Sequence, residues 1–289
     1  MSLRRQMALW LELTKARLSS LVLMTTGIGF WLGMRSPRQW PGLVFVCVGT
    51  ALVVAGANVL NQWIEREADA RMQRTCRRPL PTGMLSPDAA FRVGASLSVL
   101  GIIWLALTVN MLSAVLAAVS WASYVLVYTP LKRWTPLCTL VGAVPGALPP
   151  VIGWAGARNA INGGAWALCA ILFVWQLPHF LALAILYRDD YQRAGFPMLP
   201  LIEPGGDLTA RQILLYGAAL LPLSLFPTVL GVAGPLYFYG AMVLGVGFFL
   251  LAARAAWSHS LHSARQLFRA SVLYLPLLLG LLAIDRAPL

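Results

Sequence analysis

Charged residues are scarce in this sequence: they make up 11% of its 289 residues, whereas hydrophobic residues make up 59%. Soluble domains of this length typically carry about 25% charged residues, which cover their surface. The mean hydropathy of +0.73 agrees with the low charge content. The composition therefore excludes an ordinary soluble protein and indicates a protein that lies in a bilayer.

Cysteine is also scarce, and its positions exclude two common uses. The four cysteines are Cys47, Cys76, Cys138 and Cys169. No two of them form a C-x-x-C pair, and three fall inside hydrophobic runs, so we expect neither a disulfide framework nor a zinc site. The segment from Met1 to Arg17 is short and basic and lacks a small-residue cleavage site, so we expect no removable signal peptide.

Hydrophobic runs long enough to cross a bilayer recur along the chain. A bilayer core of roughly 30 Å requires about 17 to 25 apolar residues in a helix. Nine such runs lie between polar breaks, at residues 18–34, 41–60, 91–109, 111–128, 137–156, 165–186, 212–232, 235–253 and 267–284. We predict an all-α polytopic membrane protein with nine transmembrane helices, which form a single transmembrane domain over residues 1–289.

The net charge of +12 could suggest a nucleic-acid partner, but the positions of the basic residues explain it otherwise. With nine spans, only four of the 22 basic residues fall on the far side from the N-terminus: Arg35, Arg38, Arg158 and Arg286. This asymmetry is the positive-inside signature of membrane proteins. It predicts a cytoplasmic N-terminus, a C-terminus on the outer side, membrane lipid as the surroundings and no nucleic-acid partner.

Acidic residues number only ten, and nine of them fall on the predicted cytoplasmic side. A carboxylate near a membrane is costly unless something neutralises it. Most of these residues lie in the two loops that follow the second and the sixth predicted helix, and both loops contain prolines. We therefore expect the chemistry of the protein at these two loops.

Asn61, Glu65 and Asp69 follow one another at intervals of four residues. Each is only about 40° around a helix from the last, so the three share one face. Glu65 has no basic residue three or four positions away that could neutralise it. An amide and two carboxylates suit Mg²⁺, which binds a few protein oxygens while phosphates and water complete its octahedron. The spacing predicts a magnesium site.

Basic residues lie close to this array. Arg74, Arg77 and Arg78 follow within two to three turns, and Lys132 and Arg133 lie in the loop after the fourth predicted helix. Together they could hold a diphosphate. Metal and guanidinium groups would stabilise it as a leaving group while an apolar cavity shelters an allylic cation. The predicted chemistry is the ionisation of an allylic diphosphate at the cytoplasmic face.

Some of these charges have alternative roles. Glu67 lies four residues before Arg71, which favours an ordinary surface salt bridge. Asp69 could pair with Arg66 three residues earlier. The basic run at residues 71–78 could serve only as an anchor on anionic lipid.

Three blocks of sequence carry a resemblance to a known family. They run from Asn58 to Gly83, from Tyr128 to Trp154 and from Trp175 to Pro200, and a weaker fourth block runs from Leu13 to Arg17. In these blocks the chain resembles the UbiA-type intramembrane prenyltransferases, and within them the branch that farnesylates heme. The blocks follow one another in the order that the family has.

The resemblance implies Mg²⁺ as cofactor and farnesyl diphosphate and heme B as substrates. Farnesyl C1 would join a heme vinyl group, and water would capture the resulting cation to give heme O and diphosphate. The implied metal ligands are Asn61, Glu65, Asp69 and Asp190, which with Lys132 would also be the catalytic residues. The implied diphosphate-binding residues are Arg74, Arg78 and Lys132. Such proteins lie in the bacterial inner membrane with a cytoplasmic active site, and heme A synthase or a terminal oxidase assembly would receive the product.

Two departures from the family pattern and several alternatives remain. Quinone-type relatives carry a second D-x-x-x-D motif, whereas here Asp189 and Asp190 are adjacent, which favours the heme branch. Ala16 stands where the family usually has proline. His179 could be a heme axial ligand, a proton acceptor or simply a packed side chain. A prenyltransferase for an aromatic quinone precursor is one rival function, and a membrane transporter is another.

Overall fold

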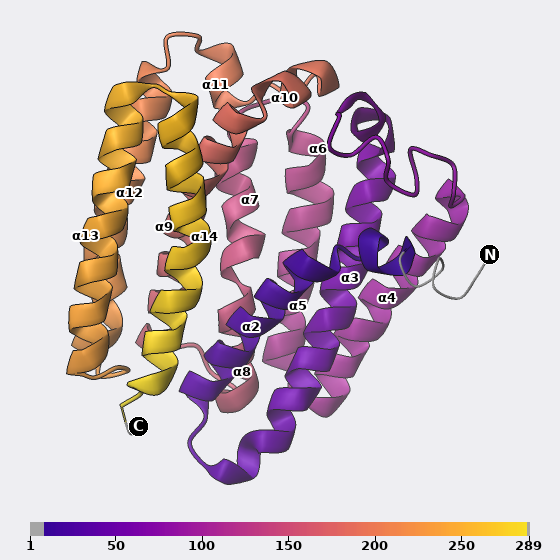
Figure 1. Cartoon of the computed structure of the whole chain (residues 1–289). Helices are drawn as coiled ribbons and strands as arrows, with labels where there is room; N and C mark the ends of the chain where they lie inside the picture. The colour runs from indigo at the N-terminus through magenta and orange to yellow at the C-terminus, as the bar shows by residue number, and fades with distance from the viewer. Residues whose placement is uncertain (1–8, 288–289) are drawn as a thin grey trace.

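The computed structural model describes residues 9–287, so Arg4 and Arg5 of the basic arm lie outside the described residues (Figure 1). Within residues 9–287 the chain forms helices and no strand, apart from one isolated bridge between Ala233 and Arg286. The prediction of an all-α membrane protein is confirmed.

The long helices correspond to the nine predicted spans. They are α2 (Ala16–Gly33), α3 (Trp40–Arg71), α4 (Pro87–Thr108), α5 (Met111–Ala122), α7 (Cys138–Ala147), α8 (Pro149–Arg158), α9 (Gly163–Leu186), α12 (Asp207–Val229), α13 (Pro235–Ser258) and α14 (Leu261–Ile284). Eight stretches of the described chain are long and apolar enough to cross a membrane. The one predicted span not among the eight is the first, at residues 18–34, which corresponds to α2; the first turns of this helix carry the polar residues Arg17, Ser19 and Ser20.

Two predicted spans are not continuous α-helices. The span at 137–156 consists of α7 and α8, which meet at Leu148 because Pro149 and Pro150 have no N–H to continue the ladder of the preceding helix. The span at 111–128 continues from α5 into a π-helical segment, η2 (Ser123–Tyr128), and a short α6 (Thr129–Leu131). Such π-helical turns often occur at functional sites.

Side-chain caps and small residues fix how these helices begin and cross. Ser86 at α4, Asn110 at α5 and Ser260 at α14 each accept a hydrogen bond from a backbone N–H three residues later. At the crossing of α2 and α8, a β-carbon on Gly29 would collide with the backbone of Pro150, and one on Gly153 with the backbone of Thr26. Only glycine permits this close approach of two helices.

The charged loops gather at one end of the bundle. Figure 1 shows α10 (Arg188–Ala194) and α11 (Leu199–Ile202) at the same end as the loop that follows α3, with the C-terminus at the opposite end. Helix α10 contacts α3, and α9 lies against α7, α12 and α14. The two loops that the sequence singled out therefore meet in space.

Candidate active site

A cavity of about 410 Å³ opens among α2, α3, α5, α9 and α14 below the loop end of the bundle. Its polar end is lined by Lys15, Asn61, Glu65, Asp69, Arg78 and Lys132. Valine, leucine, alanine, proline and aromatic side chains form most of its other walls. A charged end joined to an apolar interior suits a ligand with an anionic head and a hydrocarbon tail.

The three predicted metal ligands all lie on α3 and line this cavity. The helix continues to Arg71, so the spacing of four residues places them along one face. Asn61 is 1% exposed, Glu65 4% and Asp69 0%. Buried carboxylates require a positive partner, and the structure supplies one for each.

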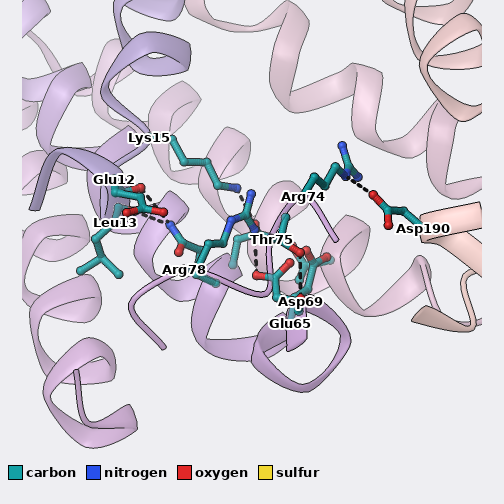
Figure 2. Close-up of polar contacts among 12 residues, drawn as sticks. Glu12, Leu13, Lys15, Glu65, Asp69, Arg74, Thr75, Arg78 and Asp190 are labelled. Carbon is teal, nitrogen blue, oxygen red and sulfur yellow. Dashed lines mark hydrogen bonds and ion pairs between the residues drawn. The ribbon is translucent and has the colours of Figure 1, made fainter. Parts of the chain in front are cut away.

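The three side chains pair one to one with three cations. The pairs, with the distance from nitrogen to oxygen, are Lys15 with Asn61 (2.8 Å), Lys132 with Glu65 (2.8 Å) and Arg78 with Asp69 (2.7 Å). Figure 2 shows the Arg78 side chain directed toward the Asp69 carboxylate. The pairing considered between Asp69 and Arg66 is therefore wrong, because the turn after α3 brings Arg78 back to Asp69. Burial acts to lower the pKa of Lys132, but the charge of Glu65 raises it well above its ordinary value.

Lys15 is a site residue that charge and spacing in the sequence do not identify. It has left-handed backbone geometry (φ 50°) just before α2. Gln62 holds the preceding turn by donating its amide to the backbone oxygens of Leu13 (2.7 Å) and Glu12 (3.4 Å) (Figure 2). Burial and then the nearby charge of Arg78 lower the pKa of Lys15 to about 7. Only the weak sequence block at residues 13–17 hinted at this position.

The oxygens on α3 fit a divalent metal. Asn61 donates its amide nitrogen to Thr129 Oγ1 (3.1 Å), which leaves its oxygen to Lys15. Asp69 Oδ1 is buried and has no hydrogen-bond partner among the described residues. Within residues 9–287, no three His, Cys, Asp or Glu side chains gather closely enough to hold a metal by themselves. A metal here would need the Asn61 oxygen and ligand phosphates as well, which is the usual manner of Mg²⁺.

Arg74 connects the two charged loops. Its guanidinium lies 4.9 Å from the ring centre of Tyr187 and 4.9 Å from that of Tyr191. Its Nε is 3.9 Å from Asp190 Oδ2, a contact drawn in Figure 2. Arg74 lines the active-site cavity and also a second cavity of about 720 Å³ on its other side.

Asp190 lines that second cavity and not the one that holds the α3 oxygens. It accepts from the Arg193 guanidinium (2.5 Å) and from the backbone N–H of Gln73 (2.8 Å). Burial acts to raise the pKa of Asp190, but these donors hold it below its usual range. The structure thus brings Asn61, Glu65 and Asp69 together and keeps Asp190 apart, on the far side of Arg74.

Two other charged groups differ from their predicted surroundings. Arg133 is exposed and donates to the backbone oxygen of Ile64 (3.0 Å), so its side chain does not line the cavity. Glu67 pairs with Arg66 (3.5 Å) and not with Arg71, so the predicted partner is wrong. Both are exposed side chains, and water leaves such pairs with little preference for one geometry.

His179 lies in the wall of the cavity formed by α9. Its Nδ1 is 2.7 Å from Ser271 Oγ. Its ring stacks between Trp175, at 5.3 Å between centres, and Phe268, at 4.9 Å. The ring is therefore held by packing and a hydrogen bond at the edge of the ligand space, and its relation to heme iron remains a prediction.

Comparison with known proteins agrees with this site. The UbiA prenyltransferase family matches residues 22–277 of the chain. The chain belongs to the UbiA prenyltransferase family. This confirms the resemblance seen in the sequence and rejects the transporter alternative. It also makes the chain a multi-pass integral membrane protein.

Relatives and solved structures give the same family and fold. The chain is 46% identical over 286 residues to the protoheme IX farnesyltransferase of Solibacter usitatus, with 96% of this chain and 98% of the relative covered. It is 44% identical to the enzyme of the same name from Koribacter versatilis, with 95% and 92% covered. A structure described as digeranylgeranylglyceryl phosphate synthase superposes with a TM-score of 0.82 at 16% identity, with 97% of this chain and 98% of that chain covered.

The arrangement of this cavity suits the prenyl transfer that UbiA prenyltransferases carry out. Cations at the polar end can bind an anionic leaving group, and the apolar walls can keep water from an allylic cation. The cavity also reaches the outer surface of the bundle through Leu18, Leu21 and Val272, all of which are partly exposed. An apolar ligand can therefore enter directly from the membrane.

Proposed function

We propose that the protein transfers a farnesyl group from farnesyl diphosphate to a vinyl group of heme B, with addition of water, and releases heme O and diphosphate. The observation that carries this proposal is the pairing of three cations with three buried oxygens at the mouth of an apolar cavity. The name shared by relatives at 40 to 47% identity supports heme as the acceptor.

Mg²⁺ is the proposed cofactor. Asn61, Glu65 and Asp69 would hold it at the polar end of the cavity. Asp190 is the proposed ligand from the second loop, and Arg74 has to move aside for it to reach the metal. When bound, the metal would neutralise the charge that develops on the leaving diphosphate. A UbiA homologue from Archaeoglobus fulgidus has been solved bound to GPP and Mg²⁺, with a TM-score of 0.67 to this chain at 16% identity and with 95% of this chain and 99% of that chain covered.

The basic residues of the site are the proposed diphosphate ligands. Lys132 and Arg78 line the cavity and can turn from their carboxylates to phosphate oxygens, and Arg74 can do so from the side of the second loop. Lys15 adds a donor at the same end. Arg133 would contribute charge from the outer edge, because its guanidinium is held by the Ile64 carbonyl.

Heme is proposed to lie against the wall formed by α9 and α14. His179 and Trp175 line the cavity there, and Val272 and Pro276 continue the wall. A ring nitrogen of His179 is the proposed ligand of the heme iron. The vinyl group to be alkylated would then face the polar end, where farnesyl C1 loses its diphosphate.

The proposed location is the bacterial inner membrane. The N-terminus and active site would face the cytoplasm and the C-terminus the outer side, as the distribution of arginine and lysine predicts. Residues 1–289 would act as a single transmembrane domain within membrane lipid. Heme A synthase or a terminal oxidase assembly is the proposed recipient of the product.

An assay of the purified protein in detergent tests the reaction. Heme B, farnesyl diphosphate and Mg²⁺ are supplied, and the extracted heme is analysed by mass spectrometry. We expect a metal-dependent mass gain equal to a farnesyl group plus a hydroxyl group. If heme stayed unmodified and a 4-hydroxybenzoate or naphthoate acceptor became prenylated, the acceptor would be an aromatic quinone precursor. The proposed diphosphate site would be unaffected by that result.

A further inference from the structure

The apolar part of the cavity has a closed end deep in the bundle, between α2, α3, α5 and α8. Thr25, Thr50, Ala117 and Ile152 line it there, one from each helix. None of these four floor residues is more than 4% exposed. They therefore form a solid floor beneath the polar end.

The depth of this floor below the polar end can be counted in residues along three helical segments that start at the same level. Lys15 and Thr129 both hydrogen-bond to Asn61, so these three residues mark the polar end at α2, α6 and α3. Thr25 lies ten residues from Lys15, Thr50 eleven from Asn61, and Ala117 twelve from Thr129. At about 1.5 Å per α-helical residue, the depths along α2 and α3 are about 15 and 16 Å, and the path from Thr129 to Ala117, which includes the π-helical segment η2 with its smaller rise per residue, is shorter than about 18 Å.

This depth matches a particular hydrocarbon chain. An isoprene repeat contributes four bonds of about 1.5 Å to the extended chain, or roughly 5 Å of length, so three repeats span about 15 Å and four span about 20 Å. A chain of three repeats that starts at the level of Asn61 therefore fits in the space above the floor residues. A fourth repeat would collide with side chains that are already close-packed.

We propose that the floor residues Thr25, Thr50, Ala117 and Ile152 select the length of the prenyl chain and favour three isoprene units. This inference rests on the proposed prenyl transfer and adds the residues that set its donor specificity. The competing course for the tail is sideways, past Leu18 and Val272 into the membrane, where nothing limits its length. Donor preference distinguishes the two courses.

Two substitutions change the depth in opposite directions. Ala117→Leu raises the floor and should shift the preference from farnesyl toward geranyl diphosphate. Ile152→Ala lowers it and should admit geranylgeranyl diphosphate. Because a single methylene in a fitted apolar pocket changes specificity by about 10-fold or more, we expect each kcat/KM ratio between donors to move by at least about tenfold.

Matched controls separate the floor from general damage to packing. Ala118→Leu adds the same bulk one residue away, and Ile171→Ala removes the same bulk from a core position, and neither residue lines the cavity. Any loss of stability lowers the rates with all donors together, so the donor ratios of the controls should stay at the wild-type values.

A binding measurement without acceptor keeps this test independent of heme. The rise in Tm of the detergent-solubilised protein is measured with geranyl, farnesyl and geranylgeranyl diphosphate in the presence of Mg²⁺. We expect farnesyl diphosphate to give the largest rise in the wild type and the order to change in both floor variants. If the wild type and both floor variants showed the same order of donors, the floor residues would not select the chain length and this inference would be wrong. If none of the three donors raised Tm, the proposed function itself would be wrong.

Discussion

Single residues at the polar end of the cavity carry the strongest predictions. Asp69 is fully buried, its Oδ2 accepts from Arg78, and its Oδ1 has no partner among the described residues. Asp69→Asn keeps the shape but removes the charge, so we expect kcat to fall by about 10²-fold or more. The rate is measured by mass spectrometry of the heme product. Glu67→Gln, at an exposed carboxylate on the same helix, should leave it unchanged, and a normal rate for Asp69→Asn would contradict the metal site.

The one-to-one pairing predicts that metal and diphosphate bind cooperatively. Mg²⁺ alone must displace cations from Asn61, Glu65 and Asp69, and diphosphate alone must draw those cations away from buried carboxylates. When both ligands bind, Mg²⁺ neutralises the carboxylates, and diphosphate pairs with the cations that have left them. Isothermal titration should therefore show that pyrophosphate lowers the Kd of Mg²⁺ by about tenfold or more. Mg²⁺ should lower the Kd of pyrophosphate by the same factor.

Lys132→Met supplies the matched variant for this titration. Without its ion pair Glu65 should bind Mg²⁺ alone more tightly than in the wild type, while pyrophosphate should bind more weakly. Arg92→Met, which removes an exposed cation on α4 outside the cavity, should change neither value appreciably. If Mg²⁺ and pyrophosphate bound independently in the wild type, the cations would not leave the α3 oxygens when the two ligands bind, and the prediction would be wrong.

His179 gives a spectroscopic prediction. Its ring lines the cavity between Trp175 and Phe268, and if a ring nitrogen binds iron, its removal changes the ligand field of the heme. We expect His179→Ala to shift the absorption spectrum of bound heme. His259→Ala, outside this cavity, is the control. An unchanged spectrum with heme still bound would assign His179 to packing against Ser271.

At this scale the sequence predicted what lies on one helix and missed what depends on distant contacts. Asn61, Glu65 and Asp69 follow from a spacing of four residues. Lys15 reaches Asn61 across 46 positions, and no local pattern contains that contact. Asp190 was recognised as acidic and important, but its side chain faces Arg193 and Gln73, which a loop sequence does not reveal.

Helices were predicted better than their irregularities. Apolar length and polar breaks gave the nine spans, because a bilayer demands both. The break at Leu148 follows from two consecutive prolines, a signal that the span at 137–156 contained. The π-helical segment at Ser123–Tyr128 has no such local signal, since it depends on how Tyr124, Tyr128 and Thr129 meet neighbouring helices around the cavity.

The crossing of α2 and α8 yields a prediction at the scale of elements. Gly153→Val would place a side chain against the backbone carbonyl of Thr26, which cannot move without displacing α2 and Lys15. Overpacking of this kind costs about 1 to 3 kcal/mol or more, so we expect a clear fall in Tm in detergent. Gly247→Ala is the control, because a β-carbon there meets nothing within 4 Å. Equal Tm values for both variants would contradict the close crossing.

The whole molecule has two ends of different charge, and this asymmetry predicts its orientation. Arg77 lies in the exposed loop after α3, beside the polar end of the cavity, and Arg38 lies exposed in the loop between α2 and α3 at the opposite end of α3. In a variant with the four native cysteines replaced by alanine, Arg77→Cys and Arg38→Cys can each be labelled with a membrane-impermeant maleimide. We expect Arg77→Cys to react only in inside-out vesicles and Arg38→Cys only in right-side-out cells, since arginine-rich loops stay in the cytoplasm. The reverse pattern would place the diphosphate site on the outer side, where cytoplasmic farnesyl diphosphate cannot reach it, and would refute the proposed donor together with the orientation.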